Sequence, residues 1–229
     1  MKSAKSAGRI IGLALLVQVV LAPPVYFRWL RPVTAPGFLE NAAGSAMQIR
    51  IALLLTFVLS AMTFIAAIAA LPVFRRYSER MAFAFLALSA VGLSTLAMES
   101  VATRNLLSLS LEVVKTGVAT EQLQILGSLA RTTRAGVHFT NLVVAHGTVC
   151  FLYIVLFRFS LVPRALAGSG MAAALLSTTA VTLPLLGYRF DFLLIVPVAL
   201  CDLALILWLM ARGLEERKRF PHAAATSIA

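Results

Sequence analysis

The chain has 229 residues, of which 60% are hydrophobic and only 13% are charged. A soluble domain is about half apolar and about a quarter charged, so this composition excludes an ordinary water-soluble fold and suits a surface that faces lipid. The formal net charge of +11 does not indicate nucleic-acid binding, because the basic residues gather at the ends of apolar runs and the sequence holds no nucleic-acid-binding motif. We expect them to contact anionic lipid head groups instead.

Apolar runs long enough to cross a bilayer, about 20 residues each, recur six times. They predict an all-α polytopic transmembrane bundle whose spanning helices cover about 10–30, 48–71, 81–101, 135–157, 170–186 and 192–210. In the first run, the Pro23–Pro24 pair removes two backbone donors and should kink the helix or end it early. Residues 31–48 contain two prolines and two glycines, which predicts a loop.

The segment 102–134 mixes charges with regularly spaced apolar residues. Leu107, Leu111, Val114 and Val118 follow one face of a helix, and we expect these four to be buried. One interpretation is an amphipathic segment of one or two helices that lies at the membrane interface or caps the bundle. The alternative is that the third spanning helix simply extends into water.

The distribution of basic residues predicts the orientation. Six spans place both ends on one side, and that side carries 12 of the 20 basic residues. The positive-inside rule therefore favours cytoplasmic termini in a multi-pass protein of the plasma membrane. We divide the chain into a basic cytoplasmic N-terminus (1–9), a six-helix transmembrane domain (10–211) with an extracytoplasmic segment at 102–134, and a charged cytoplasmic tail (212–229).

Two short stretches carry a resemblance to a known family. Leu161-Val162-Pro163-Arg164-Ala165-Leu166-Ala167-Gly168 is similar to an xLPRxLG-type turn. The segment that runs from Asp202 through Trp208 to Arg212 and Gly213 resembles a closing E-x-x-x-x-x-W-L-x-x-[KR]-G pattern. With the helix layout, they resemble the domain of unknown function 4386 family of bacterial membrane proteins, over roughly 8–213. The resemblance implies a six-helix protein of the bacterial inner membrane, with an acid at Asp202 and a histidine at His146, and implies no activity.

Three polar residues lie near the middle of predicted spans. Asp202 is the most informative, because an ionised acid at that depth costs at least a few kcal/mol unless it is paired, protonated or wet. It either serves a function or bonds a neighbouring helix, and His146 and Gln18 are the partners we expect. His146 is tunable by protonation, whereas buried amides such as Gln18 more often hold helices together.

A second group lies nearer the outer end of the bundle. His138 and Asn141 are three residues apart and share one helix face, whereas His146 is rotated about 80° from His138 at 100° per residue. Glu99 ends the third span, from where it could reach Arg134 or His138 across the bundle. The candidate ligand-binding residues are therefore Asp202, His146, Gln18, His138, Asn141 and Glu99.

Several kinds of chemistry have little support in the sequence. The two histidines of the fourth helix are about 12 Å apart along its axis and cannot share a metal ion, so we expect no metal and no cofactor. No hydrolase, dinucleotide or P-loop spacing is present. The sequence favours a binding or transport protein for a small ligand or a proton, or equally a structural subunit that binds a membrane partner or a second copy. An enzyme acting on a lipid-like substrate is the third alternative.

Overall fold

The computed structural model describes residues 4–215, and all regular secondary structure in that part of the chain is helical. Its long helices are α1 (Ala4–Pro24), α4 (Ala46–Phe74), α5 (Glu79–Thr116), α6 (Glu121–Arg158), α7 (Arg164–Thr182) and α8 (Val196–Ala211). Its short helical turns are η1 (Val25–Trp29), α2 (Arg31–Thr34), α3 (Phe38–Asn41), η2 (Ala43–Ser45), η3 (Leu183–Leu186) and η4 (Phe192–Leu194). Six helical stretches within residues 4–215 are long and apolar enough to cross a membrane, which confirms the predicted six-span bundle.

The long helices form a closed ring. Each long helix packs against the next one in the order α1, α4, α5, α6, α7 and α8, and α8 packs against α1. The core near the termini is rich in alanine, and Ala67, Ala70, Ala167 and Ala174 are each at most 1% exposed. In lipid the hydrophobic effect does not drive helices together, so small residues that let the backbones approach closely favour this packing.

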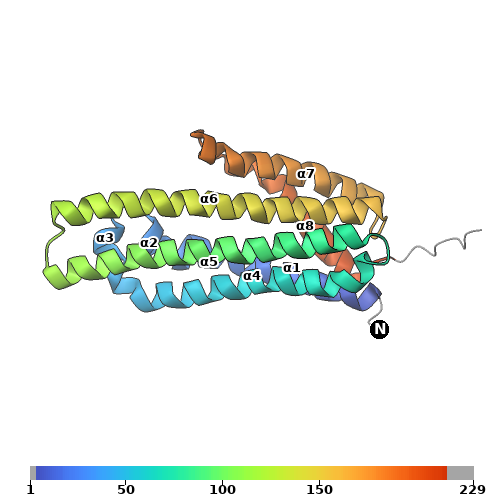
Figure 1. The fold of residues 1–229 in the computed structure, drawn as a ribbon, viewed down its shortest axis with the longest axis horizontal. Helices are drawn as coiled ribbons and strands as arrows, with labels where there is room; N and C mark the ends of the chain where they lie inside the picture. The colour runs from blue at the N-terminus through green and yellow to red at the C-terminus, as the bar shows by residue number, and fades with distance from the viewer. Residues whose placement is uncertain (1–3, 216–229) are drawn as a thin grey trace, which may run out of the picture.

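The two described chain ends lie together. The backbone of Gly8 packs against Gly213 and Leu214, and the Glu215 amide donates to the Leu161 carbonyl at 2.8 Å. The N-terminus lies at the end of the bundle opposite the α5–α6 turn (Figure 1). Both ends therefore share one side, as an even number of spans requires; most of the predicted tail, 212–229, lies outside the described residues.

The α5–α6 hairpin is the longest feature of the fold (Figure 1). Each helix has 38 residues, or about 57 Å at the usual rise per residue, against a hydrocarbon layer of about 30 Å. Gly117, in a left-handed conformation with φ of 73°, ends α5. The Thr120 hydroxyl then accepts from the Leu123 amide at 3.4 Å and caps α6. The hairpin tip therefore extends beyond the hydrocarbon layer.

Within the 102–134 segment, residues 102–116 continue α5 without a break, as the second alternative has it, and residues 121–134 form the start of α6 after the turn at 117–120. Leu107 is buried as predicted, and Leu111 is half-buried. The predicted burial of Val114 and Val118 is wrong, because they are 61% and 63% exposed. The neighbouring Val113 is buried, so Val114 and Val118 lie on a side of the hairpin tip that the elements packed against α5 do not cover.

Residues 31–48 do not form the irregular loop that their prolines and glycines predict. They fold into α2, α3 and η2, and Val33, Phe38 and Ala42 join Leu30 in the second hydrophobic core, which includes Leu106 and Leu107 of α5. Pro32 is tolerated because the first helical turn needs no amide donor there. The Ala43 amide donates to the Ser110 hydroxyl at 2.8 Å, which ties this connection to the α5–α6 hairpin.

Candidate functional site

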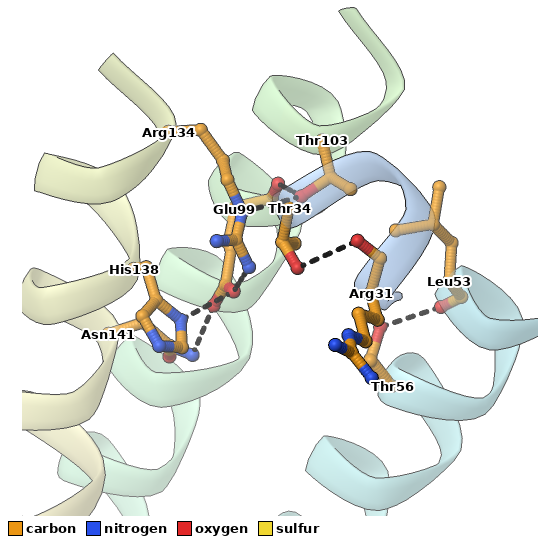
Figure 2. A network of polar contacts seen from close by, with 9 residues as sticks. All are labelled: Arg31, Thr34, Leu53, Thr56, Glu99, Thr103, Arg134, His138 and Asn141. Atoms are coloured by element: carbon orange, nitrogen blue, oxygen red, sulfur yellow. Dashed lines mark hydrogen bonds and ion pairs between the residues drawn. The ribbon is translucent and has the colours of Figure 1, made fainter. Parts of the chain in front are cut away.

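A buried carboxylate on α5 is the centre of a polar cluster between α5 and α6 (Figure 2). Glu99 is only 3% exposed. Its Oε1 atom accepts a hydrogen bond from Arg134 Nη2 at 3.3 Å and lies 2.7 Å from His138 Nδ1. Its Oε2 atom accepts from Asn141 Nδ2 at 2.9 Å. Both carboxylate oxygens are therefore hydrogen-bonded, and the charge of Glu99 is matched by a guanidinium.

Helical periodicity explains why these side chains meet. Arg134, His138 and Asn141 are four and three residues apart, so they share one face of α6. Figure 2 shows all three pointing toward Glu99 on the neighbouring helix α5. The pairing of the two faces comes from the hairpin, since α5 and α6 run antiparallel through the short turn at 117–120.

Two threonines on the Glu99 face of α5 complete the cluster. Thr95 Oγ1 lies 2.9 Å from Asn141 Oδ1, which directs the amide nitrogen of Asn141 toward Glu99. The Thr103 hydroxyl donates to the Glu99 backbone carbonyl at 2.8 Å and can accept from Arg134 Nε at 3.4 Å. The threonines thus hold the side chains of Asn141 and Arg134, the two donors on either side of His138, in position toward Glu99.

Tyr26, at the end of the first span, packs against the Glu99 cluster through His138. Its ring centroid lies 6.0 Å from that of His138. The Pro23–Pro24 pair ends α1, and the chain continues in the wider π-helical turn η1 that carries Tyr26. The prediction that the two prolines end the α-helix early is therefore confirmed. The change to a π-helical turn alters the direction of the side chains that follow, including that of Tyr26.

The cluster lies near one boundary of the apolar layer. The end of the bundle that holds the termini also holds the start of α5 at Glu79 and the end of α6 at Arg158. The helical rise places Glu99 and His138 about 30 Å along their helices from that end, which matches a hydrocarbon layer of about 30 Å. A charge costs less there than at the bilayer centre, and water is within reach of a partly exposed side chain.

The structure separates the other three candidate residues from this cluster and from one another. Asp202 Oδ1 accepts from the Tyr153 hydroxyl at 2.8 Å, so it does bond another helix, but the prediction of His146 or Gln18 as its partner is wrong. Gln18 Nε2 donates to Thr63 Oγ1 at 2.7 Å. His146 Nδ1 lies 2.9 Å from the Leu142 carbonyl of its own helix.

Sequence reasoning reaches only part of this arrangement. It selects Glu99, His138 and Asn141 as candidates, and it identifies Arg134 as a partner within reach of Glu99. It misses Tyr153; the available signal is a phenol inside an apolar span, where its hydroxyl needs a partner. Within residues 4–215 no three histidine, cysteine or acidic side chains cluster as metal ligands, and Cys150 and Cys201 are both free thiols.

Fold and cluster together define a multi-pass α-helical integral membrane protein with a buried ion-pair network between two of its spans. The chain belongs to the family described as Domain of unknown function (DUF4386), whose family model matches residues 10–213. This match confirms the resemblance found in the sequence. Comparisons with curated proteins and with solved structures found no match.

Proposed function

We propose that this membrane protein binds a proton at the Glu99–His138 pair and responds to it, without catalysing a reaction. One observation carries the proposal: a titratable imidazole nitrogen lies 2.7 Å from a buried carboxylate oxygen. Histidine is the side chain that normally changes charge near neutral pH. The pair therefore has the chemistry to report on the proton concentration at its side of the membrane.

The arrangement supports protonation of His138 rather than of Glu99. Arg134 and Asn141 both donate to the carboxylate, and a carboxylate that accepts charged and amide donors is stabilised as the anion. His138 Nε2 has no hydrogen-bond partner among residues 4–215, and the side chain is 23% exposed against 4% for that of Glu99. The imidazole is thus the group through which a proton enters.

Protonation changes the electrostatic balance between three parts of the chain. With neutral His138, the Glu99 and Arg134 charges cancel. A proton on His138 adds a second cation against the same carboxylate oxygen that Arg134 contacts. Tyr26 on η1 packs against this imidazole. We therefore propose that the proton alters how the end of the first span packs against α6.

A structural role is the second candidate for the remaining polar residues. Asp202, Gln18 and His146 each bond a different neighbour, which does not support one mid-membrane centre for a ligand or a transported ion. The Asp202–Tyr153 and Gln18–Thr63 bonds join α8 to α6 and α1 to α4. Such bonds hold transmembrane helices together at about 0.6–2 kcal/mol each.

We expect fusions of a topology reporter to place the Glu99 cluster outside the cytoplasm. The proposed orientation has both ends in the cytoplasm of a cell with this protein in its plasma membrane, and the bias of 12 in 20 basic residues supports it. Reporters inserted at Ala46 and at Thr120 should both read as external, and a fusion after Arg76 should read as cytoplasmic. A cytoplasmic signal at either of the first two would reverse the orientation.

Nuclear magnetic resonance of nitrogen-15-labelled histidine tests proton binding directly. In the wild-type protein, acidification should convert the ring nitrogens of His138 to the doubly protonated form, and the Nδ1 proton should resonate far downfield because the Glu99 carboxylate accepts it. The downfield signal should be absent in Glu99→Gln, and His138→Asn identifies which resonances belong to this residue.

The same samples give the control. His146 bonds a backbone carbonyl, so its Nδ1 resonance should be unaffected by Glu99→Gln. Spin labels near the outer ends of α1 and α6 should report a pH-dependent distance in the wild type and a constant distance in His138→Asn. If the His138 ring keeps one protonation state at every pH at which the protein stays folded, the Glu99–His138 pair has only a structural role.

A further inference from the structure

A groove on the outside of the ring, between α4 and α5, has the layout of a binding site for an amphiphile. Its volume is ≈ 590 Å³, within the range of about 300–1,000 Å³ for pockets that hold small molecules. Arg50 and Arg104 lie on its wall, together with apolar side chains that include Leu54, Phe57 and Val101.

The two arginines are exposed and have no ion-pair or hydrogen-bond partner among residues 4–215. This distinguishes them from Arg134, which contacts Glu99, and from Arg75, which contacts Glu79 at 2.9 Å. Two unpaired guanidinium groups on one groove attract an anion that has several oxygen acceptors. A phosphate is suited to them, because each guanidinium can donate two parallel N–H hydrogen bonds to its oxygens.

Depth places these arginines at the level of lipid head groups. The end of the bundle with the termini also holds the end of α4 at Phe74 and the start of α5 at Glu79. The helical rise places Arg50 and Arg104 about 36–38 Å along their helices from that end. A hydrocarbon layer of about 30 Å lies within a bilayer of about 40–45 Å, so both reach the polar layer of the opposite leaflet.

The apolar side chains of the groove lie deeper. Leu54 and Phe57 are one and two turns further into the membrane than Arg50, and they are 67% and 40% exposed. Val101 lies about one turn deeper than Arg104 and is 60% exposed. The groove is therefore cationic at head-group depth and apolar below it, which is the polarity of a single phospholipid molecule.

Ser100 adds an independent observation. Its residue is 8% exposed, its Oγ atom is buried and has no hydrogen-bond partner among the described residues, and it lines this groove. Buried hydroxyls are normally satisfied. Ser100 lies one turn deeper than Arg104, at the level where the ester groups of a lipid follow its phosphate.

We propose that this groove binds one anionic glycerophospholipid from the leaflet opposite the termini. Arg50 and Arg104 contact the phosphate, the Ser100 hydroxyl donates to an ester oxygen, and an acyl chain lies along Leu54 and Phe57. The site uses the other side of α5 from Glu99 and does not depend on proton binding there.

Native mass spectrometry of the full chain in neutral detergent tests the proposal. We expect the wild type to retain one phosphatidylglycerol in preference to phosphatidylcholine with the same acyl chains. Arg50→Gln with Arg104→Gln should weaken phosphatidylglycerol binding by about tenfold or more, because two charged contacts are lost. Ser100→Ala should weaken it less, and glycerol phosphate without acyl chains should not compete.

The matched control removes the same charge elsewhere on the same side of the membrane. Arg131→Gln with Arg189→Gln should change the affinity less than about twofold, since both are exposed and lie outside the groove. Thermal unfolding confirms that each variant is folded. Equal losses in the two double variants would show diffuse attraction of charge, and unchanged binding in Arg50→Gln with Arg104→Gln would equally overturn the site. Competition by glycerol phosphate would show a phosphate site rather than a lipid site.

Discussion

Replacing Glu99 by leucine lowers the free energy of unfolding by about 3–5 kcal/mol, because it leaves Arg134 as an unpaired buried charge. The Arg134 side chain is only 13% exposed, and the Glu99 side chain is 4% exposed. His138 and Asn141 lose their acceptor in the same substitution, so three donors are left without the carboxylate that holds them. We expect this to be the largest effect of any single substitution in the cluster.

Unfolding by a denaturing detergent measures this loss, and a second substitution separates its causes. Adding Arg134→Met to Glu99→Leu removes the orphaned charge, so the double variant should be more stable than Glu99→Leu alone. A double variant that is no more stable would show that the loss comes from the hydrogen bonds of His138 and Asn141 rather than from the charge.

An exposed ion pair on the same helix supplies the control. Glu112 and Lys115 are 3.1 Å apart, but their side chains are 49% and 72% exposed. Glu112→Leu should therefore change the free energy of unfolding by less than about 1 kcal/mol. Equal losses for Glu99→Leu and Glu112→Leu would contradict the burial of the Glu99 cluster.

Replacing Gly170 by alanine should lower the free energy of unfolding by about 1–3 kcal/mol, the range for overpacking a filled core. A Cβ atom at this position on α7 would overlap the ring of Tyr153 on α6. Tyr153 is 0% exposed, so its ring has no free space to move into. Any displacement of the Tyr153 ring also breaks its hydrogen bond to Asp202 on α8. The added methyl group therefore disturbs the packing of α6, α7 and α8 together.

Gly168 on the same helix is the matched control for this substitution. A Cβ atom there would lie 3.5 Å from the Phe157 ring, an ordinary contact. Gly168→Ala should be neutral or stabilising by up to about 1 kcal/mol, because alanine favours the helix. Tyr153→Phe keeps the ring and removes only the hydroxyl, so the difference between it and Gly170→Ala isolates the steric part. Equal stability of Gly168→Ala and Gly170→Ala would contradict the close α6–α7 packing.

The number of spans and their order along the chain follow from the sequence alone. Hydropathy is a sum over neighbouring residues, so runs such as 170–186 and 192–210 define helices without any knowledge of their neighbours. The same local logic places His138 and Asn141 on one face. It could not decide between an interfacial helix and a longer α5 at 102–134, because the apolar period of 3.6 residues is the same in both.

Only the tertiary structure decided which polar residues meet. The sequence places Asp202, His146 and Gln18 at similar depths, but depth does not specify the rotation of a helix or its neighbour in the ring. Gly170 has no side chain and so lets α7 lie directly against Tyr153 of α6. Closure of the ring brings α8 close enough for Asp202 to reach Tyr153. Glu99 reaches Arg134 and His138 because a short turn fixes α5 antiparallel to α6. For Asp202 no such local connection exists, and its partner depends on packing between helices that are distant in the chain.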